Sequence, residues 1–180
     1  LRRFLLLKKS IDDVKYHYDN LVSHHKFINS KKVNFFKKKI VNKKENKAEI
    51  SVHSIIKDLK IKKAILKCDI EGTEYEIIEE ITKYNEIFDC ILIEFHEIEK
   101  NINKFKDNIE KLSQFYYIVH LHGNNHDPII DEINIPNTLE ITFVKKKFIK
   151  VGEFVNKFPV KNLDNPNNPN LKDHEFEFNN

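Results

Sequence analysis

The stretch AILKCDIEGTEYEII, residues 64–78, constrains the fold of this chain more than any other stretch. Its apolar beginning, interrupted by Lys67, is typical of a short strand that is buried on both faces at the centre of a parallel sheet. Gly72 has the backbone freedom for a tight turn after this strand. The periodicity that follows predicts an amphipathic helix. Its apolar side contains Tyr75, Ile78 and Ile81.

Two acidic residues, Asp69 and Glu71, lie where this strand is expected to end. In open α/β sheets, ligands bind in the crevice beyond the carboxyl ends of the strands. The sequence therefore predicts that both acids belong to a functional site.

Helical and strand patterns alternate from residue 51 onward. This alternation predicts an α/β fold whose sheet is mostly parallel and has an antiparallel closing strand. The expected helices cover residues 51–59, the segment that follows the turn at Gly72, and residues 98–112. The expected strands cover residues 64–70, 88–95, 116–121 and 139–144.

The first fifty residues carry weaker patterns, and we expect residues 1–50 to form a partial N-terminal region. Residues 11–27 have helical spacing, and residues 33–41 are typical of an exposed or edge strand. Residues 1–7 fit either a strand or the end of a helix. We expect residues 51–150 to form the core. Residues 151–180, rich in Asn and Pro, are expected to form a tail and not a second domain.

Composition excludes several classes of protein. The net charge of +3 gives no case for nucleic-acid binding, and we interpret the lysines of residues 31–47 as a solvated surface in preference to an anion site. No apolar run approaches the roughly 18 residues that cross a bilayer. Cys68 and Cys90 lie in apolar strand patterns, which favours a reducing, cytoplasmic setting. The absence of Met, also at position 1, suggests an alternative start or a true beginning further upstream.

Polar residues follow three of the expected strands, and parallel strands end at the same edge of a sheet. We therefore expect one joint site and not three coincidences, although an acid after a strand is as often a helix cap. The three groups are Asp69 with Glu71, Glu94 with His96, and His122 with Asn124 and Asn125.

A metal site is an alternative interpretation of these groups. His120 and His122 alternate, so on a strand they share a face, and further nitrogen and oxygen ligands are available. These are His126, Asp127, Glu94 and Asp69. No compact ligand motif is present, so structural or substrate-contacting histidines are favoured and no metal is expected. No nucleophilic serine or cysteine motif is evident either.

Several segments in order resemble the FkbM-type methyltransferases. LKCDIEGTEYEII, with Lys67, Asp69, Glu71 and Gly72, is similar to the hallmark strand and turn of that family. ILIEFH at residues 91–96 looks like its next strand. HLHGNN, PNTLEITFV and the ending FPVKNLDNPNNPN resemble its closing strands and tail.

The resemblance implies a Rossmann-like sheet and transfer of a methyl group from S-adenosylmethionine to oxygen, on a sugar, glycan or small metabolite. It implies that Asp69 borders the cofactor and that Glu71, His96 or His122 takes the proton of the acceptor hydroxyl. Glu94, Asn124 and Asn125 would orient the acceptor.

The family binds its cofactor over a glycine-rich turn after the first strand, whereas no glycine precedes Gly72 here. We therefore expect an N-terminally truncated domain, and two alternatives stay open. One is a non-catalytic remnant or interaction module, and the other is a metal-dependent enzyme using the DIE and HLH clusters. The strand at residues 64–70 would then have an uncovered edge, available to residues 1–7, to residues 33–41 or to a partner chain, including a second copy.

Overall fold

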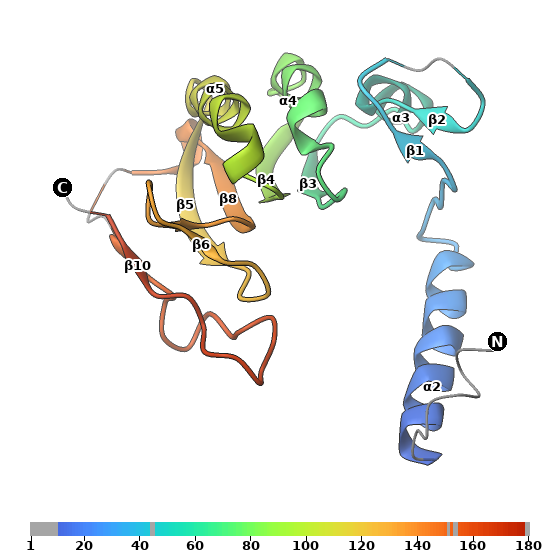
Figure 1. Ribbon diagram of the computed structural model, residues 1–180. Helices are drawn as coiled ribbons and strands as arrows, with labels where there is room; N and C mark the ends of the chain where they lie inside the picture. The colour runs from blue at the N-terminus through green and yellow to red at the C-terminus, as the bar shows by residue number, and fades with distance from the viewer. Residues whose placement is uncertain (1–10, 44–45, 151, 153–154, 179–180) are drawn as a thin grey trace. The chain divides into compact units, whose positions relative to one another are not determined.

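The computed structural model of the chain describes residues 11–43, 46–150, 152 and 155–178 (Figure 1). The chain divides into two units, with the boundary between residues 38 and 39. The boundary was expected at residue 50, twelve residues later in the chain. The second unit begins earlier because β1 (Lys39–Ile40) pairs in parallel with β2 (Glu49–Ile50) inside it. Residues 1–7, for which a strand or helix end was expected, lie outside the described part.

The first unit contains the helix α2 (Ile11–Ile28), as the spacing of residues 11–27 predicts. Tyr18 and Leu21, which contribute to this helical spacing, are exposed. The strand expected over residues 33–41 is wrong in extent, since only Lys39–Ile40 form a ladder. A strand needs a hydrogen-bonding partner, and β2 is only two residues long; beyond the ladder, the Val41 backbone nitrogen donates to the Ile50 carbonyl oxygen over 2.9 Å.

The second unit is a mixed α/β structure built on a four-stranded mixed sheet of order β3-β4-β8-β5. β3 and β4 pair in parallel, whereas β8 is antiparallel to both β4 and β5. β3, β4 and β5 consequently point the same way, and β8 lies between β4 and β5. The strands are β3 (Ala64–Cys68), β4 (Phe88–Phe95), β5 (Tyr116–Gly123) and β8 (Leu139–Lys145).

The helices α4 and α5 lie side by side over the sheet (Figure 1). Tyr75, Ile78 and Ile81 of α4 are buried, as its periodicity predicts. Ser51 caps α3 by accepting a hydrogen bond from the Ser54 backbone nitrogen. The bounds are α3 (Val52–Asp58), α4 (Glu74–Lys83), a 3-10 turn η1 (Glu99–Asn101) and α5 (Ile102–Ser113).

The C-terminal segment packs against this core. Phe158 and Phe176 are buried with their rings stacked 5.5 Å apart, and they bring together two short antiparallel strands. Aromatic burial therefore holds in place a segment whose composition predicts only a tail. The remaining short elements are β6 (Ile129–Ile130), β7 (Ile135–Pro136), η2 (Lys146–Phe148), β9 (Lys157–Phe158) and β10 (Phe176–Glu177).

The strand β3 is not buried on both faces, so that expectation is wrong. Ile65 is 71% exposed, because β3 is an outer strand that pairs only with β4 in the described sheet. The deeply buried strand is β4, where Ile91, Ile93 and Phe95 are almost fully covered. Among the described residues, no helix has both the length and the apolar character needed to cross a membrane.

We predict that the thiol of Cys68 is inert in the folded protein. Burial, followed by the charges of Glu74 and Asp69, raises the pKa of Cys68 from its ordinary value of 9.0 to about 12. A shift of this size lowers the thiolate fraction at pH 8 about a thousandfold. Iodoacetamide labelling at pH 8, read by peptide mass spectrometry, should modify Cys68 only after unfolding in urea. Because the folded pKa is the higher one, the stability that Cys68 contributes is complete below pH 9 and falls as the pH rises toward 12.

Candidate functional site

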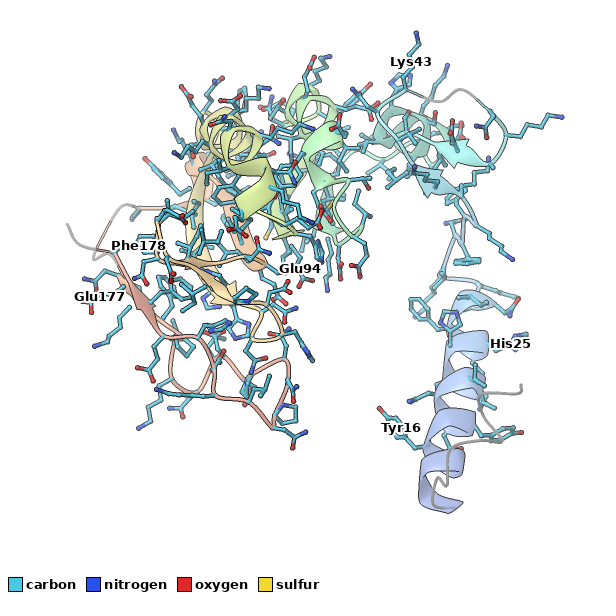
Figure 2. All side chains as sticks on the ribbon, in the orientation of Figure 1. Tyr16, His25, Lys43, Glu94, Glu177 and Phe178 are labelled. Atoms are coloured by element: carbon cyan, nitrogen blue, oxygen red, sulfur yellow. The ribbon has the colours of Figure 1, made fainter. Side chains whose placement is uncertain are left out.

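Acidic side chains and a histidine meet at the edge where β3, β4 and β5 end. The Nε2 atom of His96 lies 3.6 Å from Glu71 Oε2 and 4.0 Å from Glu94 Oε1. Asn124, which follows β5, donates a hydrogen bond to Glu94 Oε1 over 2.9 Å. Residues that follow all three strands thus share one network, and Glu94 is labelled at this end of the sheet in Figure 2.

Asp69 completes the group on the β3 side. One ligand atom each of Asp69, Glu94 and His96 lies within 4.8 Å of the other two. The Asp69 carboxylate also lies 3.8 Å from Lys67 Nζ, whose side chain is largely exposed. We call Asp69, Glu71, Glu74, Glu94 and His96 the rim cluster.

Glu74 is the residue of the rim cluster that the sequence analysis missed. Its side chain is fully buried and accepts hydrogen bonds from the backbone nitrogens of Ile70 and Gly72, each over 3.0 Å. It also lies 3.0 Å from His96 Nδ1. Glu74 is the first residue of α4, where a carboxylate is stabilised by the helix dipole. The sequence shows an acid just after the glycine turn, but the inward direction of its side chain follows from the tertiary fold.

The turn between β3 and α4 has a left-handed backbone at two consecutive residues. Gly72 has φ 96°, which its lack of a side chain permits, and Glu71 has φ 56°. A non-glycine residue in this region is strained by about 1 kcal/mol or more. The side chain of Glu71 is 87% exposed, so the turn projects a carboxylate from the rim cluster into solvent.

Tyr75 of α4 holds the backbone of His96 in place. Its hydroxyl donates a hydrogen bond to the His96 carbonyl oxygen over 2.7 Å. Burial, with the charges of Glu74 and Glu97, raises the pKa of Tyr75 above its ordinary value. The hydroxyl therefore stays protonated as a donor at neutral pH. Sequence reasoning placed Tyr75 only on the apolar side of the helix.

The histidines of β5 contact the C-terminal segment. His120 Nε2 lies 2.8 Å from Asp164 Oδ1, and His122 Nε2 lies 3.3 Å from Asp173 Oδ2. Asp127, another ligand of the alternative metal site, accepts a hydrogen bond from the Thr138 hydroxyl. The two histidine contacts bind the HLH cluster to the C-terminal segment. A role for His122 as a base stays a prediction.

Asn125 also holds the C-terminal segment. It is buried, accepts a hydrogen bond from the Asn168 backbone nitrogen over 2.8 Å and donates to the Asn168 carbonyl oxygen over 3.0 Å. A weaker bond reaches the Leu171 carbonyl oxygen. Its amide is fully occupied by backbone partners, and a contact with an acceptor stays a prediction.

We predict that Asn125→Ala loosens the C-terminal segment. The change leaves backbone groups of Asn168 without their partners, which costs about 1–3 kcal/mol locally. Amide hydrogen exchange should therefore speed up over residues 160–176 and stay unchanged in β4. Asn167→Ala is the matched control, because Asn167 is exposed and makes one long bond to Glu140. Equal protection of the segment in both variants would contradict the prediction.

Comparison of the chain with protein-family models, curated proteins and solved structures finds no significant match in any of the three.

Proposed function

We propose that the chain is part of an FkbM-type methyltransferase that O-methylates a sugar or another small metabolite with S-adenosylmethionine. The observation that carries the proposal is the meeting of Asp69 and Glu71, from the family-like turn after β3, with Glu94 and His96 at the end of β4. The presence of one antiparallel strand in a sheet whose other strands point the same way fits the expected architecture.

His96 is the residue best placed to act as a general base. Its Nδ1 atom is held by the buried Glu74, which leaves Nε2 directed toward Glu71 and Glu94. A base needs an oriented nitrogen within reach of the acceptor hydroxyl, and a carboxylate behind the ring stabilises the imidazolium that forms. Glu71 is an alternative base because its carboxylate is exposed. In this proposal Glu94 and Asn124 orient the acceptor through their shared hydrogen bond.

The described residues do not by themselves fit a complete S-adenosylmethionine site. No glycine precedes Gly72. On the outer side of β3, a cavity of about 270 Å³ is lined almost entirely by apolar side chains, including Val52, Ile56 and Leu66. A sulfonium nucleoside with a carboxylate needs backbone amides and polar partners, which this lining does not offer. We therefore assign no transfer step, and Asp69 as a cofactor contact stays a proposal.

Calorimetric titration with S-adenosylmethionine tests the proposal. If the chain is an autonomous methyltransferase, the folded chain binds the cofactor, and Asp69→Asn weakens binding whereas Asp89→Asn does not. Asp89 is a matched control, since its side chain is 32% exposed against 36% for Asp69 and it lies at the other end of β4. Absence of binding by protein with native circular dichroism would overturn an autonomous methyltransferase.

A second candidate function, a protein interaction module, is favoured by the outer edge of β3. An apolar outer strand with Ile65 exposed is prone to pair with another strand. We propose a second copy of this chain as the occupant, because antiparallel pairing of two β3 strands about Leu66 places Lys63 of one copy opposite Asp69 of the other. Opposite charges across such a pair are stabilising.

Sedimentation velocity distinguishes this candidate from a monomer. The wild-type chain should form a dimer at micromolar concentration, and Ile65→Lys should shift it to monomer. Val119→Lys is the matched control, because Val119 is exposed on β5, the strand at the opposite edge. A wild-type monomer, or a dimer that survives Ile65→Lys, would exclude pairing through β3.

A further inference from the structure

We propose that Asp69, Glu94 and His96 bind one divalent transition-metal ion, such as Mn²⁺ or Zn²⁺. Their ligand atoms already lie within 4.8 Å of one another. Ligand atoms about 2.1 Å from a shared ion are roughly 3.0–3.6 Å apart, so small side-chain rotations close the site. The inference goes beyond methyl transfer and does not depend on it. With an ion bound, His96 Nε2 is a ligand, and Glu71 is then the candidate base.

The charge of the rim cluster favours a cation. Four carboxylates, from Asp69, Glu71, Glu74 and Glu94, surround a single imidazole. Glu74 is fully buried and the Glu94 side chain is 10% exposed, so water screens their repulsion poorly. Lys67 is the only lysine or arginine whose ion pair with this cluster is seen among the described residues, and its side chain is 70% exposed. A bound dication would relieve this repulsion directly.

The way in which the ligands are held also favours a metal ion. Glu74 binds His96 Nδ1 and so fixes the ring with Nε2 directed toward Glu94 and Glu71. Histidines that ligate metals characteristically have their other nitrogen bonded to a carboxylate in this manner. Glu94 is oriented in turn by Asn124. These outer contacts distinguish the site from a surface patch of acids.

The chemistry of the ligands selects the kind of ion. One imidazole with carboxylates suits Mn²⁺, Fe²⁺ or Zn²⁺, whereas Mg²⁺ and Ca²⁺ prefer all-oxygen sites. Glu71, exposed and 3.6 Å from His96 Nε2, can supply a further oxygen.

Titration with MnCl₂, followed by the electron paramagnetic resonance signal of free Mn²⁺, tests the proposal on the whole chain. Wild-type protein should remove one Mn²⁺ per chain from the free signal, and equimolar Zn²⁺ should displace it. Asp69→Asn should weaken Mn²⁺ binding at least about tenfold, as loss of a ligating carboxylate does. Asp89→Asn, matched in exposure and placed at the other end of β4, should bind as the wild type does.

Three results would overturn the proposal. These are no uptake of Mn²⁺ by folded wild-type protein, uptake that Asp69→Asn leaves unchanged, and displacement of Mn²⁺ by an equimolar amount of Mg²⁺. His96→Gln provides a second variant and should lose binding while circular dichroism reports the fold. Metal uptake is read without S-adenosylmethionine, so its failure is distinguishable from failure of the methyltransferase proposal.

Discussion

Replacement of Glu74 by alanine is expected to lower the free energy of unfolding by about 3–5 kcal/mol, measured by urea denaturation. The fully buried carboxylate accepts hydrogen bonds from the backbone nitrogens of Ile70 and Gly72 and holds His96. Alanine leaves two half-buried backbone donors and the imidazole without their partner, and each such loss is costly.

Two variants sharpen this experiment. Glu74→Gln keeps one acceptor oxygen and should fall between wild type and alanine. Glu76→Ala is the matched control two residues along the same helix, where the exposed carboxylate pairs with Lys104 over 2.8 Å. An exposed ion pair contributes about 0–1 kcal/mol to the free energy of unfolding, so Glu76→Ala should have little effect. Similar losses in Glu74→Ala and Glu76→Ala would contradict the role of Glu74 as the buried organiser of the turn.

Truncation of Phe143 to alanine is expected to lower the free energy of unfolding of the wild-type chain by about 3–5 kcal/mol. Phe143 is completely buried on β8, where it pairs with Ile91 of β4 and Ile118 of β5. Removing the ring leaves a cavity in the core beside β8, the strand that pairs with both β4 and β5. Collapse of that cavity is limited because β8 has a strand on each side.

Phe148→Ala is the control for the phenylalanine experiment. Phe148 follows the same strand in the chain but is 56% exposed. Its truncation should change the free energy of unfolding by about 0.5 kcal/mol or less. Both variants are compared by the midpoint and slope of the urea transition. A loss below about 1 kcal/mol for Phe143→Ala would mean that β8 is not the centre of the packing.

Local patterns predicted the sheet and its helices well. The strand expected over residues 88–95 has the same bounds as β4. A mostly apolar run of this length predicts a strand well when the strand is covered on both faces. The burial of β3 was not predictable from its composition, since exposure depends on which strand lies beside it. Residues 33–41 show the same limit, because β-propensity does not supply a partner strand.

The candidate site was predictable only in part. Glu71, Glu94, His96 and Asn124 were expected together from the strand ends, and they share one network. Glu74 was missed, because nothing local distinguishes an acid that turns inward from one that faces solvent. His122 and Asn125 contact residues 168–173, more than 40 positions away. Contacts at that separation follow from the tertiary fold and not from spacing.

The place of β8 in the sheet also governs the order in which the chain can fold. β4 and β5 follow each other in the sequence but are never neighbours, because β8 separates them. During synthesis, one edge of β4 stays without a partner until residues 139–145 have left the ribosome. Such late, long-range pairing slows folding and exposes strand edges to aggregation. We therefore expect nascent chains that end before residue 139 to require chaperones, whereas chains extended past β8 can complete the sheet.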